Sequence, residues 1–252
     1  MIRLIARIDS RNLNHIKTVQ CEGVKVIRPV IESLSLFSSG SNEHDEILVI
    51  DNVASLYGVG NWLTKYSQDH HYAPLPLSIG GGIRSIDEAT RTLRLGADKV
   101  VLNTSAIENP TLLDILSDRL GRQALILQVD TRKINGDYYC FTHGARELSK
   151  YRVSEWLQMA QERGVGEVFI TSIDTEGCNR RFPEELASIA SESTNLPIIL
   201  SGGINDAPQI ASLHQDFKID AFCFSSIVNT QHKTVQLLRQ ELSSLGLPIR
   251  NP

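Results

Sequence analysis

Two aspartates, Asp9 and Asp130, lie at the ends of apolar runs and are 121 residues apart. Two carboxyl groups over one pocket can perform general acid–base catalysis when their environments keep one protonated and the other ionised. Lys17 follows in what we expect to be a long loop, from which its ammonium group could reach a developing charge or a phosphate. In the competing interpretation the aspartates are caps or loop hydrogen-bond acceptors, and Lys17 is a solvated loop residue.

Two glycine-rich turns follow other apolar runs at the same offset of 121 residues. SIGGGI contains Gly81 and Gly82, and ILSGGI contains Gly202 and Gly203. A backbone without a Cβ atom lets N–H groups approach an anion closely, so each turn predicts a phosphate site. Two such sites favour a ligand with a phosphate at each end, although glycines can also simply close tight loops. The polar residues that we expect to face the turns are Asn103 and Thr104 in the first site and Ser225 and Ser226 in the second.

Four charged residues begin predicted strands: Arg3, Glu46, Lys99 and Glu167. Side chains of a strand alternate between its two faces, and counting back in twos from Asp9 places Arg3 on the inner face. If the other three also point inward, two cations and two anions surround one end of the sheet. Buried charges must be paired, so we expect a ring of four salt bridges. The alternatives are exposed charges at strand starts, or a plug that only stabilises the fold.

The elements that must position these residues are eight short apolar runs alternating with amphipathic, helix-like stretches. The runs are 4–8, 47–50, 75–79, 100–102, 125–129, 168–171, 198–200 and 221–224. Strands alternating with helices predict a parallel sheet, and eight such units in about 250 residues predict a closed (β/α)8 (TIM) barrel. The repeated motifs divide the single domain 1–252 into half-barrels of approximately 1–121 and 122–252. An open doubly wound sheet is the weaker alternative.

Composition excludes several classes of protein. The net charge of −4 over 252 residues argues against a nucleic-acid partner, which requires a basic surface. The sequence has no apolar run long enough for a membrane span, and its first residues are too few for a signal peptide. The four cysteines form no CxxC motif, and no metal or cofactor site is indicated. We therefore expect a reduced, cytoplasmic protein.

Longer motifs give a resemblance to a known family. They are RLIARID, EILVID, SIGGGI, GADKVVLNT, GVGEVFITSIDTEG and PIILSGG, which are spread over nearly the whole chain. Together they resemble the cyclase subunit of imidazole glycerol phosphate synthase, of histidine biosynthesis. The related isomerase of the same pathway shares the half-barrel repeat but fits GADKVVLNT and TSIDTEG less well.

The resemblance implies a lyase of two subunits that needs no cofactor. A glutaminase subunit would dock at the N-terminal face of the barrel and release ammonia, which would travel through the barrel to a bis-phosphorylated ribulosyl aminoimidazole carboxamide. The products would be imidazole glycerol phosphate and an aminoimidazole carboxamide ribotide. Asp9, Asp130 and Lys17 match the family's catalytic residues, and Asp98 matches a residue of the glutaminase interface. The resemblance makes Arg3, Glu46, Lys99 and Glu167 the ammonia gate, and adds Gly177 to the phosphate-binding residues.

Several residues depart from the family pattern. Arg7, Gln128 and Phe169 are expected to face inward and are larger than usual, so they would narrow the middle of the barrel. Glu176 replaces an aspartate, and Asp206 follows the second glycine turn, where a negative charge disfavours phosphate. The departures resemble second-copy homologues found with surface-polysaccharide genes. That resemblance implies an alternative function, the delivery of ammonia to a sugar amidotransferase, and a phosphate-binding barrel without a glutaminase is a third interpretation.

Overall fold

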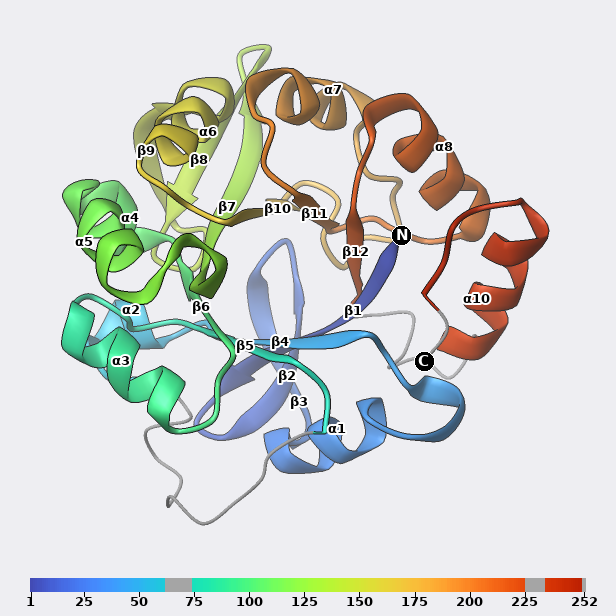
Figure 1. The fold of residues 1–252 in the computed structure, drawn as a ribbon, viewed down its shortest axis with the longest axis horizontal. Helices are drawn as coiled ribbons and strands as arrows, with labels where there is room; N and C mark the ends of the chain where they lie inside the picture. The colour runs from blue at the N-terminus through green and yellow to red at the C-terminus, as the bar shows by residue number, and fades with distance from the viewer. Residues whose placement is uncertain (62–73, 225–233, 251–252) are drawn as a thin grey trace.

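Eight parallel strands close into a barrel, as the sequence predicts (Figure 1). The computed structural model describes residues 1–61, 74–224 and 234–250. Consecutive barrel strands are hydrogen-bonded neighbours, and pairing of β10 with β7 and of β12 with β1 closes the sheet. The barrel strands are β1 (Arg3–Arg11), β4 (Glu46–Asp51), β5 (Leu77–Gly80), β6 (Lys99–Leu102), β7 (Leu125–Ile134), β10 (Glu167–Ser172), β11 (Ile198–Ser201) and β12 (Ala221–Phe224).

Helices cover the outside of the barrel (Figure 1). Side chains cap two of them: Ser85 accepts a hydrogen bond from the Glu88 amide before α3, and Asp206 accepts one from the Gln209 amide before α8. No helix in the described part of the chain is long and apolar enough to cross a membrane. The helices are α1 (Val30–Phe37), α2 (Ala54–Tyr57), α3 (Ile86–Arg94), α4 (Thr104–Glu108), α5 (Thr111–Leu120), α6 (Val153–Glu162), α7 (Glu184–Ser193), α8 (Ala207–Phe217) and α10 (Val235–Ser244), with 3-10 turns η1 (Gly40–Asn42) and η3 (Arg122–Ala124).

Two antiparallel hairpins extend the barrel at equivalent positions of the repeat. β2 (Asn14–Val19) and β3 (Glu22–Pro29) follow β1, whereas β8 (Asp137–Thr142) and β9 (Glu147–Arg152) follow β7. The first hairpin corrects the sequence-based expectation, because Lys17 lies on strand β2 rather than in a loop. The expected half-barrel boundary near residue 121 falls between α5 and β7, and the division itself stays a prediction.

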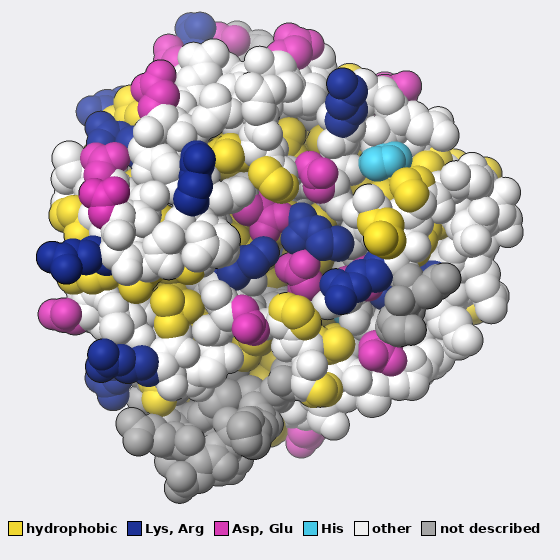
Figure 2. All heavy atoms as spheres, viewed as in Figure 1, with side chains coloured by type: hydrophobic (Ala, Val, Ile, Leu, Met, Phe, Trp, Pro, Cys, Tyr) yellow, Lys and Arg dark blue, Asp and Glu magenta, His cyan; other side chains and the backbone are white. Residues whose placement is uncertain are grey.

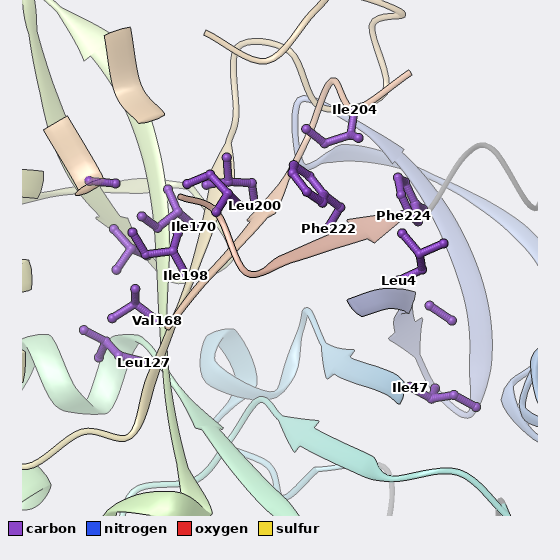
Figure 3. Packing of buried hydrophobic residues seen from close by; sticks show 14 of the residues in the cluster. Leu4, Ile47, Leu127, Val168, Ile170, Ile198, Leu200, Ile204, Phe222 and Phe224 are labelled. Carbon is purple, nitrogen blue, oxygen red and sulfur yellow. The ribbon is translucent and has the colours of Figure 1, made fainter. Parts of the chain in front are cut away.

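The buried apolar side chains form two shells. The outer shell lies between the barrel and its helices, and Figure 3 shows part of it, including Leu4, Leu127 and Phe222. Burial of this shell supplies the main driving force for folding. The inner shell fills the barrel itself and consists of Ile5, Leu48, Ile50, Val101, Ile126, Phe169, Ile199, Ala221 and Cys223. The polar residues considered next interrupt this inner shell at both ends.

Candidate active site

Asp130 lies inside the barrel at the carboxyl end of the strands and is 2% exposed. The amide of Gln128 donates to both of its carboxylate oxygens, at 2.8 and 3.0 Å, and the amide of Asn103 donates to Oδ2 at 2.9 Å. Burial raises the pKa of Asp130, and the charge of Arg7 and the hydrogen bond from Gln128 oppose that rise. A carboxyl group with a raised pKa suits proton transfer near neutral pH.

Asp9 is held differently, because it forms an ion pair inside the barrel. Arg7 Nε lies 3.1 and 3.0 Å from its two carboxylate oxygens, and Arg7 Nη2 lies 3.0 Å from Oδ1. Both residues are almost fully buried, at 1% exposure for Asp9 and 2% for Arg7. The environments of Asp9 and Asp130 therefore differ, as acid–base work requires, but the base candidate is occupied by a guanidinium.

Arg7 also crosses the barrel interior. Its Nη1 donates to the hydroxyl of Thr171 at 3.0 Å and reaches Ser201 Oγ at 3.4 Å. Its guanidinium carbon lies 5.4 Å from the centre of the Phe169 ring, within the range of a cation–π contact. Arg7, Phe169 and Gln128 thus narrow the middle of the barrel, which confirms the prediction that these three larger residues face inward.

A pocket beside Asp130 contains the first glycine turn. Its empty space is about 750 Å³, including the open mouth, and its lining includes Gly81, Gly82, Asn103 and Thr104. Both glycines have positive φ, and a Cβ atom on either would lie within 2.4 Å of a backbone oxygen, of Asp51 or Val59 respectively. Close packing of the backbone is therefore enough to explain why glycine occupies these two positions, and a phosphate site here stays a prediction.

A second, smaller pocket contains the second glycine turn, and its lining includes Lys17, Gly177, Gly202 and Gly203. These three glycines also have positive φ and lie against backbone atoms of neighbouring segments. Glu176 lines the pocket too. Burial and the nearby charge of Asp9 raise the pKa of Glu176. Ser225 and Ser226, predicted for this site, lie outside the described residues.

Asp206 does not line this second pocket, contrary to the expectation from the sequence. Its carboxylate accepts the Gln209 amide at the start of α8 and pairs with Arg181 at 3.1 Å. The negative charge at the second pocket is instead that of Glu176, which accepts hydrogen bonds from the Thr18 hydroxyl and the Cys21 amide.

The other end of the barrel holds the predicted ring of four charges. Arg3 bridges the two carboxylates, lying 2.9 Å from Glu46 Oε1 and in contact with Glu167. Lys99 Nζ lies 3.0 Å from Glu167 Oε2 and 3.9 Å from Glu46 Oε2. Figure 2, which looks down the barrel, shows basic and acidic side chains gathered over its middle. Burial alone would lower the pKa of Arg3, but the two glutamates raise it above its ordinary value. The role of the ring as an ammonia gate stays a prediction.

Asp98 precedes Lys99 and is exposed beside the ring. Its Oδ2 accepts the backbone amide of Leu77 at 2.7 Å, which ties the start of β6 to the start of β5. The side chain therefore has a structural role here, and its place in a partner interface stays a prediction.

Sequence reasoning missed several residues in and beside the two pockets. Thr171 and Ser201 contact Arg7, while Cys21 and His143 line the first pocket. Alternation along β10 and β11 gives a signal for Thr171 and Ser201, since both lie an even number of residues from inward-facing positions. Nothing in the sequence marks Cys21 or His143, which reach the pocket from hairpins. Within the described residues, no group of three or more potential ligands could hold a metal ion.

Comparisons with known proteins agree with this architecture. A family model described as "Histidine biosynthesis protein" matches residues 4–233. The imidazole glycerol phosphate synthase subunit HisF of Legionella pneumophila is 38% identical over 81% of this chain and 95% of its own length. The subunit of the same name from Staphylococcus aureus (strain MRSA252) is 33% identical over 98% of both chains. The chain therefore belongs to the histidine biosynthesis protein family, and the two relatives named above are HisF subunits of imidazole glycerol phosphate synthase.

Proposed function

We propose that this protein is the cyclase subunit of an imidazole glycerol phosphate synthase. It would use ammonia to convert a bis-phosphorylated ribulosyl aminoimidazole carboxamide into imidazole glycerol phosphate and an aminoimidazole carboxamide ribotide, as a lyase. One observation supports this most strongly: two buried carboxyl groups and two glycine-turn pockets lie at the opposite end of the barrel from a ring of four charges. The family membership agrees with it.

Each group has a chemical role in this proposal. Asp130, whose pKa is raised by burial, would donate or accept the proton that moves during ring closure. Asp9 would act as its ionised partner once Arg7 no longer holds it. Lys17, on the wall of the second pocket, would bind a phosphate or stabilise developing negative charge.

The ring supports a partner at the same end. We infer that a glutaminase subunit docks over Arg3, Glu46, Lys99 and Glu167, beside Asp98, and delivers ammonia through the barrel. Transfer inside a protein keeps ammonia away from water. The sugar amidotransferase alternative has no comparable support, since the reported relatives are HisF subunits.

The decisive experiment supplies ammonium salt and the bis-phosphorylated substrate without any glutaminase. Formation of imidazole glycerol phosphate by the purified chain, and its loss in Asp130→Asn, would support the cyclase function. Thr131→Val is a matched control, because Thr131 is the buried neighbour of Asp130 on β7 and lines neither of the two pockets. No product from a folded protein at saturating substrate would refute the proposed activity.

A further inference from the structure

The Arg7 guanidinium is shared between the two pockets. Arg7 lines the first pocket, with Asp130, and the second, with Lys17 and Glu176. The side chain begins on β1 and ends against Thr171 of β10 and Ser201 of β11. It therefore forms the wall between the pockets and the floor of the barrel mouth.

The same guanidinium occupies the Asp9 carboxylate, which is therefore not free to accept a substrate proton. Three contacts of 3.0–3.1 Å join Arg7 to the carboxylate of Asp9. A carboxylate with this many charge-assisted hydrogen bonds is a poor acceptor for a substrate proton. Arg7, whose guanidinium carbon lies 5.4 Å from the centre of the Phe169 ring, also lies in the barrel interior through which ammonia would rise. In this arrangement Asp9 can accept a substrate proton only after Arg7 moves.

A phosphate bound in the second pocket could draw Arg7 away from Asp9. A phosphate there would lie among Lys17, the glycine turn and Arg7. A guanidinium binds phosphate oxygens in the same two-pronged geometry as carboxylate oxygens, so phosphate competes directly with Asp9 for Arg7. The hydroxyl of Ser201, which Arg7 Nη1 reaches at 3.4 Å, lines that pocket.

We propose that Arg7 is an anion-responsive clamp: a phosphate group entering the second pocket takes Arg7 from Asp9, which frees Asp9 and opens the middle of the barrel. The consequence is that ammonia reaches the mouth only when the substrate is bound. Arg7 is a positioning residue in this scheme. The inference rests on the proposed function for its catalytic consequence, but the clamp itself is tested by anion binding alone.

Movement of Arg7 would also change the pKa of Asp130. The groups that face Asp130 are Arg7 and Asp9 of β1, Gln128 on its own strand, Asn103 after β6 and Thr171 of β10, with Cys21 and Cys140 nearby. Arg7 lowers the pKa of Asp130, so its departure raises that pKa further and strengthens the hold of Asp130 on its proton. Phosphate binding would thus separate the two carboxyl groups into a free carboxylate and a protonated acid.

A double-mutant cycle with inorganic phosphate as the probe tests the clamp. The backbone amide signals of Gly82 and Gly203 in NMR titrations report the first and second pockets separately. We expect Asp9→Asn to tighten phosphate binding at Gly203 about tenfold, because phosphate no longer competes for Arg7, and Arg7→Met to weaken it about tenfold. Binding at Gly82 should change less than twofold in both variants.

The double variant Arg7→Met/Asp9→Asn separates the clamp from simple removal of negative charge. If Asp9→Asn increases phosphate affinity through Arg7, the double variant binds phosphate as weakly as Arg7→Met. If Asp9→Asn increases phosphate affinity equally in the wild type and in Arg7→Met, the proposal is overturned. Should the unpaired Asp9 prevent Arg7→Met from folding, the double variant has no buried unpaired charge, and its comparison with Asp9→Asn still decides.

A crystal soaked in phosphate gives the geometric readout. The clamp predicts Arg7 within hydrogen-bond distance of a phosphate in the second pocket and separated from Asp9. Phosphate bound there with the Arg7–Asp9 contacts unchanged, or no phosphate there at saturation, would overturn it. If phosphate binding and the movement of Arg7 follow these predictions but the protein forms no cyclised product, the proposed function is refuted and the clamp is still supported.

Discussion

Replacement of Lys99 by Met tests whether the ring of charges acts as a gate or only as a plug. The side chain of Met has a similar length but carries no charge, so the substitution removes one cation and little volume. Each glutamate keeps a partner in this variant, because Arg3 contacts both Glu46 and Glu167. Lys99 contributes only one close contact, at 3.0 Å to Glu167, and its side chain is 26% exposed.

These contacts set the magnitude of the stability loss. A partly exposed ion pair contributes about 1 kcal/mol or less, so we expect Lys99→Met to unfold at most about 2–4 °C below the wild type in a chain of this size. Arg3→Met removes the cation that both glutamates share and leaves them with Lys99 alone. Breaking a more buried pair in this way costs about 3 kcal/mol, so Arg3→Met should be clearly the less stable variant.

The functional assay compares two sources of nitrogen. With the glutaminase subunit and glutamine, Lys99→Met should hydrolyse several glutamines for each product formed, because ammonia escapes or stalls at the ring. With ammonium salt, which enters at the mouth, its rate should stay within about twofold of the wild type because the mouth is unchanged. An equal loss with both sources would show that the ring only holds the fold together. A larger thermal shift for Lys99→Met than for Arg3→Met would refute the reasoning from contacts.

Three further outcomes follow from the buried groups. Because burial raises the pKa of Asp130 above its ordinary value of 3.8, the wild type loses stability as the pH rises from about 4 through the folded pKa. Urea unfolding of Asp130→Asn, measured across this range, should lack that loss, and its cyclisation rate should fall at least about 100-fold. Burial lowers the pKa of His44 from 6.5 to about 4. The wild type should therefore lose up to about 3 kcal/mol of stability as the pH falls from 6.5 to 4, because the unfolded chain binds a proton that the folded chain does not. Urea unfolding of His44→Leu over the same pH range should not show this decrease. Glu176→Gln should tighten inorganic phosphate binding at the Gly203 amide several-fold near pH 7 and leave binding at Gly82 unchanged, because the carboxyl group lines only the second pocket; equal effects at both amides would contradict this assignment.

The barrel was predictable because parallel strands buried on both faces are continuous apolar runs. Alternation along β1 also identified Arg3 and Arg7 as inward-facing, since a strand places every second side chain on one face. Alternation does not predict which of these inward-facing side chains contact one another. That Arg7 takes both carboxylate oxygens of Asp9 and lies over Phe169 depends on rotamers and on neighbouring strands, which no spacing in the sequence encodes.

The two hairpins show where turn signals succeed and fail. The β7–β8 turn has Asn135 and Gly136 with positive φ, the residue pair that this kind of two-residue turn prefers. The β2–β3 turn uses Gln20 and Cys21 with φ of 53° and 60°, and neither residue type favours that conformation. Tertiary contacts hold it, since the backbone oxygen and the carboxylate of Glu176 accept the amides of Gln20 and Cys21 respectively. The position of Lys17 on β2 could therefore not be predicted locally.

The charges at the two ends of the barrel differ in a way that bears on function. The ring is self-contained, because two cations and two carboxylates satisfy one another. Among the described residues, the two pockets at the mouth are lined by the carboxyl groups of Asp51, Glu108, Asp130 and Glu176 and by the cations Arg7, Arg84 and Lys17. Burial raises the pKa of Asp130 and of Glu176. Each proton taken up there removes a repulsion that an incoming phosphate would meet. Anion binding at the mouth is thus coupled to protonation of these carboxyl groups, whereas the ring can keep its charges whether or not a ligand is bound.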